Sequence, residues 1–139
     1  MRDKTLGILV LVAAFLLAAH NADHIARGDL RWPLTMQSVP FLLVLLAVFA
    51  LIGGGLYLYQ HNKVGPGFWA ILGAVSVALG WLGHFSPFTD QPPQYIFHAY
   101  RSALAGSLAV GTLAALMLGL IATTIYAGVL WLRGRAPQR

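Results

Sequence analysis

Residues 5–27 read TLGILVLVAAFLLAAHNADHIAR, and this stretch decides how the rest of the chain is interpreted. Its uninterrupted apolar part ends at Ala19, yet the hydrocarbon core of a bilayer is ~30 Å thick and needs about 20 helical residues. A helix that crosses the membrane must therefore carry His20, Asp23 and His24 toward the far interface. Ionisable side chains at membrane depth are costly and usually mark a functional site.

The composition is that of a membrane protein. The chain has 139 residues, of which 58% are hydrophobic and 9% are charged, and its mean hydropathy is +0.72. The net charge of +5 lies in loops and termini, where the sidedness of membrane insertion explains it, so we expect no nucleic-acid partner. No long polar linker divides the chain, which predicts a single transmembrane domain, residues 1–139.

Two residue types are missing, and their absence excludes several kinds of site. Without cysteine the chain has no disulfide, no thiolate metal ligand and no cysteine nucleophile. Without glutamate its only side-chain carboxylates are Asp3, Asp23, Asp29 and Asp90. A carboxylate-rich di-iron centre is therefore implausible.

The apolar stretches predict an all-α integral membrane protein with four transmembrane helices. These helices are expected at about 5–26, 39–60, 67–85 and 94–132. Short loops make the early helices antiparallel neighbours, so we expect an up-down four-helix bundle. The last stretch is longer than one span requires and should tilt or project from the membrane.

An even number of spans puts both termini on one side of the membrane. That side carries six basic residues: Arg2, Lys4, Lys63, Arg133, Arg135 and Arg139. The other side carries three: Arg27, Arg31 and Arg101. By the positive-inside rule, both termini are expected in the cytoplasm, in a multi-pass protein of a bacterial cytoplasmic membrane.

The first apolar stretch also has the charged start and short apolar core of a signal peptide. Cleavage after Ala19 or Ala22 would put Leu17 or His20 at the −3 position, where a small residue is needed. We therefore expect the first helix to be retained.

Small residues recur every four positions in the last helix and predict a packing seam. They are Ser107, Gly111, Ala115, Gly119, Thr123 and Ala127. Helices in lipid associate through close backbone approach across such residues. The seam could join helices within one chain or two copies of it.

Four histidines gather at the end of the bundle that should face the periplasm or cell exterior. His20 and His24 are four residues apart, so a helix presents both imidazoles on one face, where they can hold one metal ion. Asp23 shares that face and could bind the ion or orient an imidazole ring. His84 and His98 come from other segments at the same depth. We predict a metal site formed by His20, Asp23, His24, His84 and His98.

Other residues at this depth are expected to line the site or to stand behind its ligands. They are Arg27, Trp81, Tyr95, Arg101 and Ser102. The loop at 85–94 contains three prolines, which stiffen it, and we expect it to cover the outer mouth of the bundle.

Several occupants suit such a site. Imidazole binds zinc, copper or iron, and geometry must choose among them. A b-type haem with two axial histidines is a second interpretation, since no cysteine exists for covalent attachment. A quinone or lipid pocket is a third. In a fourth, these side chains only hydrogen-bond to one another and to headgroups.

The leading hypothesis is a metal or haem centre in the outer leaflet that serves redox chemistry or metal handling. The sequence indicates no substrate and no catalytic residue, so whether the protein is an enzyme stays open. The alternative is an accessory subunit that packs through the helix seam, and a small transporter is a third hypothesis. The expected partners are the lipid bilayer and either a second copy of the chain or a larger membrane complex.

Overall fold

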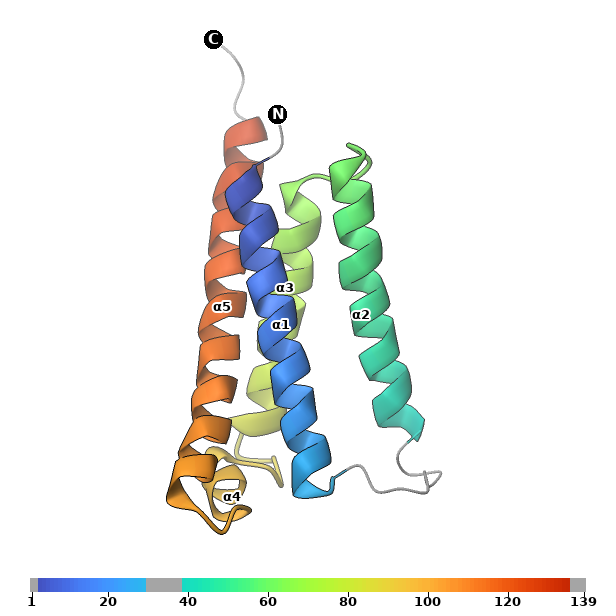
Figure 1. Ribbon diagram of the computed structural model, residues 1–139. Helices are drawn as coiled ribbons and strands as arrows, with labels where there is room; N and C mark the ends of the chain where they lie inside the picture. The colour runs from blue at the N-terminus through green and yellow to red at the C-terminus, as the bar shows by residue number, and fades with distance from the viewer. Residues whose placement is uncertain (1–2, 30–38, 136–139) are drawn as a thin grey trace.

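The computed structural model describes residues 3–29 and 39–135, and within these ranges every regular element is a helix (Figure 1). The helices are α1 (Lys4–Arg27), α2 (Val39–Gln60), α3 (Pro66–His84), α4 (Pro93–His98) and α5 (Ala103–Arg135). Three of the basic residues counted on the two sides of the membrane lie outside the described residues: Arg2, Arg31 and Arg139.

Four of these helices are long and apolar enough to cross a membrane, namely α1, α2, α3 and α5. The prediction of a polytopic membrane protein is confirmed at this level. The bounds of α1, α2 and α3 lie within one residue of those expected.

Local sequence signals fix the ends of α1 and the start of α3. Asp3 caps α1, since its Oδ1 accepts a hydrogen bond of 2.9 Å from the backbone N–H of Leu6. Gly28 ends α1 in the left-handed conformation, with φ of 82°, which a residue with a side chain rarely adopts. Pro66 occupies the first turn of α3, where its missing N–H costs nothing.

The chain runs up and down between two ends of the molecule (Figure 1). The start of α1 and the end of α5 lie at one end, where the hydroxyl of Tyr126 donates to Oδ2 of Asp3 over 3.0 Å. The ends of α1 and α3 lie at the other, together with α4.

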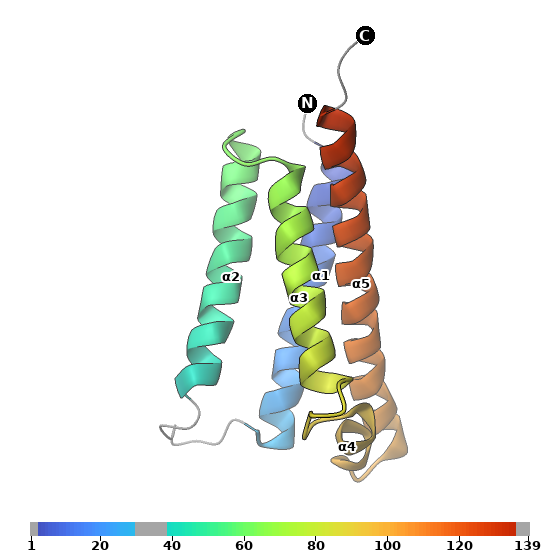
Figure 2. The same ribbon diagram turned by 180° about the vertical axis from the view of Figure 1, so that it is seen from behind.

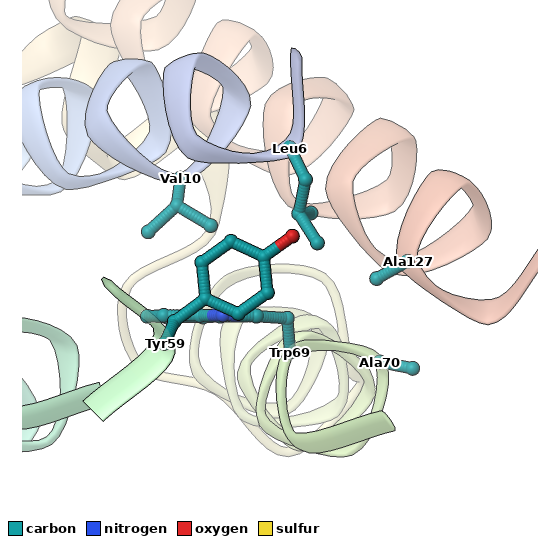
Figure 3. Close-up of a cluster of buried hydrophobic side chains, with 6 residues drawn as sticks. All are labelled: Leu6, Val10, Tyr59, Trp69, Ala70 and Ala127. Atoms are coloured by element: carbon teal, nitrogen blue, oxygen red, sulfur yellow. The ribbon is translucent and has the colours of Figure 1, made fainter. Parts of the chain in front are cut away.

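The main packing is between α5 and its two neighbours, α1 and α3 (Figure 2). Glycines on α3 permit this close approach: a Cβ on Gly67 would lie 2.7 Å from the indole of Trp131, and one on Gly73 would overlap the hydroxyl of Thr124. A buried apolar cluster continues the contact near the termini (Figure 3). Its buried members are Leu6, Val10, Tyr59, Trp69, Ala70 and Ala127.

Helix α2 shares little buried surface with the other three long helices. Its only buried residues are Gly55 and Tyr59. Tyr59 packs edge-on against Trp69, and a Cβ on Gly55 would lie 2.5 Å from the ring of Phe68. The four predicted spans are present, but α2 is joined to the rest mainly at the end that holds the termini.

The single helix expected at 94–132 is two helices, which corrects the prediction. The short helix α4 packs against α5 through Ile96, which is fully buried beside Ala109 and Leu113. Gly106 makes this possible, because a Cβ there would lie 2.5 Å from the carbonyl oxygen of Phe97. Residues 99–102 form the turn between the helices.

Only part of the predicted seam on α5 is buried against other helices. Thr123 and Ala127 are buried, Ala115 and Gly119 are half-buried, and Ser107 and Gly111 are exposed. A helix has 3.6 residues per turn, so a row with a spacing of four drifts around it. Toward the start of α5 the buried face is instead formed by Gly106, Ala109, Leu113 and Leu116.

Candidate metal centre

Three histidine side chains meet where α1 and α3 end. Nε2 of His20 lies 3.1 Å from Nε2 of His84 and 3.2 Å from Nε2 of His24. One ligand atom from each residue can be chosen so that all three lie within 4.8 Å of one another. The three histidines could therefore hold one metal ion between them.

The local fold explains why these imidazoles converge. His20 and His24 occupy successive turns on the face of α1 that looks toward α3. Helix α3 ends at His84. The N–H of Phe85 makes the last helical bond to the carbonyl of Trp81, and the N–H of Ser86 bonds to the same carbonyl instead of continuing the helix.

Partners on the far side of the rings orient two of the imidazoles. Nδ1 of His84 lies 3.1 Å from the backbone carbonyl oxygen of Gln91, which can only accept, so Nδ1 carries the proton and Nε2 presents a lone pair. Nδ1 of His24 lies 2.9 Å from Oδ2 of Asp29, and donating to this carboxylate also leaves the lone pair on Nε2.

Nδ1 of His24 has a second polar neighbour besides Asp29. Nη2 of Arg27 lies 3.0 Å from Nδ1 of His24. A guanidinium only donates, so Nδ1 either accepts from Arg27 or donates to Asp29, depending on the tautomer. A metal ion on Nε2 selects the tautomer that donates to Asp29.

His20 lies at the centre of the cluster and is almost fully buried, with 5% of its surface exposed. A neutral imidazole has one N–H, so Nε2 of His20 can donate to only one of its two neighbours. The other contact then has no hydrogen bond, whereas a cation between the nitrogens would accept a lone pair from each of them. Two nitrogens at 2.0–2.1 Å from a tetrahedral zinc ion are about 3.3 Å apart, close to the spacings found here.

Asp23 stands beside the cluster and does not join the three imidazoles. Its Oδ2 accepts from Nε of Arg27 over 2.8 Å, and its Oδ1 accepts from the hydroxyl of Tyr100 over 2.5 Å. Burial and the bond to Asp23 raise the pKa of Tyr100 to about 12, so its hydroxyl keeps its proton and donates. Both oxygens of Asp23 thus have partners other than an imidazole.

Arg27 holds the end of α1 to the loop that follows α3. Its side chain is only 1% exposed and pairs with Asp23 and, through Nη1 at 2.9 Å, with Oδ2 of Asp29. Nη1 also donates to the side-chain oxygen of Gln91 over 3.2 Å. This network closes the loop side of the histidine cluster.

The other predicted residues lie away from the three imidazoles. His98 is exposed on α4, where its ring packs edge-on against Phe97. Trp81, Tyr95 and Arg101 are also exposed. Ser102 is exposed just before α5, and its Oγ lies 3.5 Å from the backbone nitrogen of Ala105.

Three residues of the network were not among those predicted to form the site: Asp29, Gln91 and Tyr100. A signal for Asp29 existed, because Gly28 predicts a left-handed helix end, and this turn lets the N–H of Asp29 bond back to the carbonyl of His24. No sequence pattern indicates Gln91 or Tyr100, which reach the site only through tertiary packing.

An apolar cavity of about 220 Å³ reaches the cluster from inside the helices. Its wall includes His20 and His84, and the rest of its lining comes almost entirely from apolar side chains of α1, α2, α3 and α5. The site therefore has a polar side, closed by Arg27 and the loop, and an apolar side that adjoins a cavity.

Comparison with known proteins finds no match to a family model, to a curated protein or to a solved structure.

Proposed function

We propose that this protein binds one transition-metal ion within the membrane through Nε2 of His20, His24 and His84. The observation that carries the proposal is the convergence of these nitrogens at 3.1 and 3.2 Å, at the ends of two apolar helices. Outer partners on His24 and His84 support it, because metal-bound histidines almost always donate their second N–H to a carboxylate or a carbonyl.

The ligand set favours zinc, copper or ferrous iron. Imidazole nitrogens suit these ions, whereas magnesium and calcium prefer oxygen ligands. Three protein ligands leave one position of a tetrahedral ion open, as in zinc sites that exchange a ligand and unlike closed structural sites. An open position suits redox chemistry or metal handling, the two roles that we propose.

The spacing favours a single ion over a b-type haem. Two axial nitrogens on opposite faces of one iron stand roughly 4 Å apart, with the macrocycle between them. The Nε2 atoms of His20 and His84 are closer than this, at 3.1 Å, so the helices would have to separate to admit a porphyrin. A Soret band that persists through purification would favour the haem instead.

We further propose that the site faces the periplasm of a bacterial cell. The histidines lie at the end of the molecule opposite the start of α1 and the end of α5 (Figure 1). The excess of basic residues at the latter end supports a cytoplasmic position for it.

The direct test is metal content. We expect the purified full chain, stripped with a chelator and then dialysed against zinc, to retain about one zinc per chain, measured by elemental analysis. The double variant His20→Ala, His24→Ala should retain almost none. The variant His61→Ala, which alters an exposed histidine in the turn between α2 and α3, should bind zinc as the wild type does. Circular dichroism and gel filtration report whether the variants fold. Full zinc binding by a folded double variant would refute the proposal.

An accessory role is the second candidate, supported by the exposed part of the α5 seam. Ser107 and Gly111 face outward, and a Cβ on Gly111 meets no atom within 4 Å, so this patch is open to a second copy or another membrane subunit. Gly111→Leu should break such an association and leave zinc binding intact. Chemical crosslinking in native membranes measures the first effect, and unchanged crosslinking would refute the accessory role.

A further inference from the structure

The cavity beside the histidines is long and narrow. Its wall extends from Val10 to His20 on α1 and from Trp69 to His84 on α3. At a rise of 1.5 Å per residue, the shorter of these stretches covers about 15 Å along the helices. A volume of about 220 Å³ spread over such a length suits one extended chain better than a ring system.

The residues that line the cavity favour a ligand that is apolar along most of its length. The two hydroxyls in the wall are already used within their own helices: Ser76 donates to the carbonyl of Leu72 over 2.9 Å, and Thr123 donates to that of Gly119 over 2.7 Å. The remaining lining away from the histidines is almost wholly aliphatic or aromatic. Such an occupant comes from the bilayer rather than from water.

The fixed charges around the site favour an anion. Asp23 and Asp29 contribute two negative charges, and Arg27, which pairs with both, contributes one positive charge. A divalent ion on the three neutral imidazoles changes the sum from −1 to +1. One negative charge on the occupant brings this sum to zero, and that balance is favoured because the side chains of Asp23 and Arg27 are buried.

We propose that the cavity binds a long-chain fatty acid from the membrane, with its carboxylate at the coordination position that the three histidines leave open. The inference rests on the proposed metal site and adds the class of ligand that the metal meets. The acyl chain lies along the cavity between α1 and α3, and the polar side of the site stays closed by Arg27.

The test uses cobalt(II), whose visible absorption bands respond to a change of coordinating atoms. The full chain in phosphatidylcholine nanodiscs is loaded with cobalt and titrated with dodecanoate. We expect the bands to shift and to saturate near one dodecanoate per chain. Acetate, which has the carboxylate without the chain, and 1-dodecanol, which has the chain without the charge, should each bind at least about tenfold more weakly.

A matched pair of variants tests the cavity itself. Ala14→Phe fills the lining and should weaken dodecanoate binding at least about tenfold, whereas Ala18→Phe, one turn along α1 on its exposed side, should not. Cobalt content is measured in each sample. One bound cobalt with no response to dodecanoate, or equal binding of acetate and dodecanoate, would overturn this inference alone. A wild-type chain that binds no cobalt would overturn the proposed metal site as well.

Discussion

Nε2 of His20 and Nε2 of His84 lie 3.1 Å apart although 64 residues separate them in the chain. The contact joins the last turns of α1 to the final residue of α3, and His24 adds a third nitrogen from the same face of α1. Three imidazole nitrogens in contact at one end of a set of apolar helices form the strongest chemical feature of the described structure. Four predictions test how this arrangement is held together.

The first prediction concerns which histidine outside α1 binds the metal ion, His84 or His98. His84→Ala should weaken zinc binding by more than about 100-fold, since loss of an outer partner alone typically costs 10- to 100-fold. His98→Ala should change the affinity by less than about twofold, because His98 is exposed beside Phe97 and lies outside the cluster. Competition with a chromophoric chelator measures both affinities. A larger loss in the His98 variant would contradict the structure.

The second concerns the carboxylate behind His24. Asp29→Ala should weaken zinc binding about tenfold or more, because the ring loses the acceptor that fixes its tautomer. The same chelator competition gives the affinity. Asp90→Ala is the matched control, since Asp90 is exposed. Equal affinities of the two variants would show that Asp29 does not orient the ring.

The third concerns the hydroxyl that bonds to Asp23. Tyr100→Phe should lower the free energy of unfolding by about 1–2 kcal/mol, because one oxygen of a buried carboxylate loses its donor. Tyr95→Phe, at an exposed ring, should have little effect. Denaturant titrations followed by circular dichroism give both values.

The pH dependence of this contribution follows from the raised pKa of Tyr100. A group whose pKa is higher in the folded state stabilises the protein fully below its unfolded value of about 10, and that stability is lost as the pH rises through about 12. The difference between wild type and Tyr100→Phe should therefore stay constant from about pH 6 to pH 9. A difference that falls within this range would show that the hydroxyl is not the donor.

The fourth concerns the contact between α3 and α5. Gly73→Ala should destabilise the fold by about 1–3 kcal/mol, because the new methyl group would overlap the hydroxyl of Thr124 and lie 3.3 Å from its Cβ. Gly111→Ala, in open space on α5, should instead stabilise by about 0.5–1 kcal/mol through its helix propensity. Unfolding in mixed detergent measures both. Removing the hydroxyl with Thr124→Ala should restore part of the loss in the Gly73 variant.

The sequence predicted the elements well because their signals are local. Apolar runs of about 20 residues place α1, α2 and α3 to within one residue. The break between α4 and α5 was missed because residues 94–132 stay compatible with one helix. The burial of Ile96 against α5, together with the close approach at Gly106, favours the folded-back arrangement.

The candidate site also has one part that the sequence predicts and one part that depends on tertiary packing. The spacing of His20 and His24 places two imidazoles on one helical face, which periodicity alone determines. The tertiary structure decided that His84 joins them and His98 does not, since this depends on how α3 and α4 are rotated against α5. Contacts at single residues such as Gly73 and Gly106 set these rotations, and no periodic pattern encodes them. The chain thus determined by itself its four spans and one pair of imidazoles, and helix packing decided which third imidazole and which outer partners complete the site.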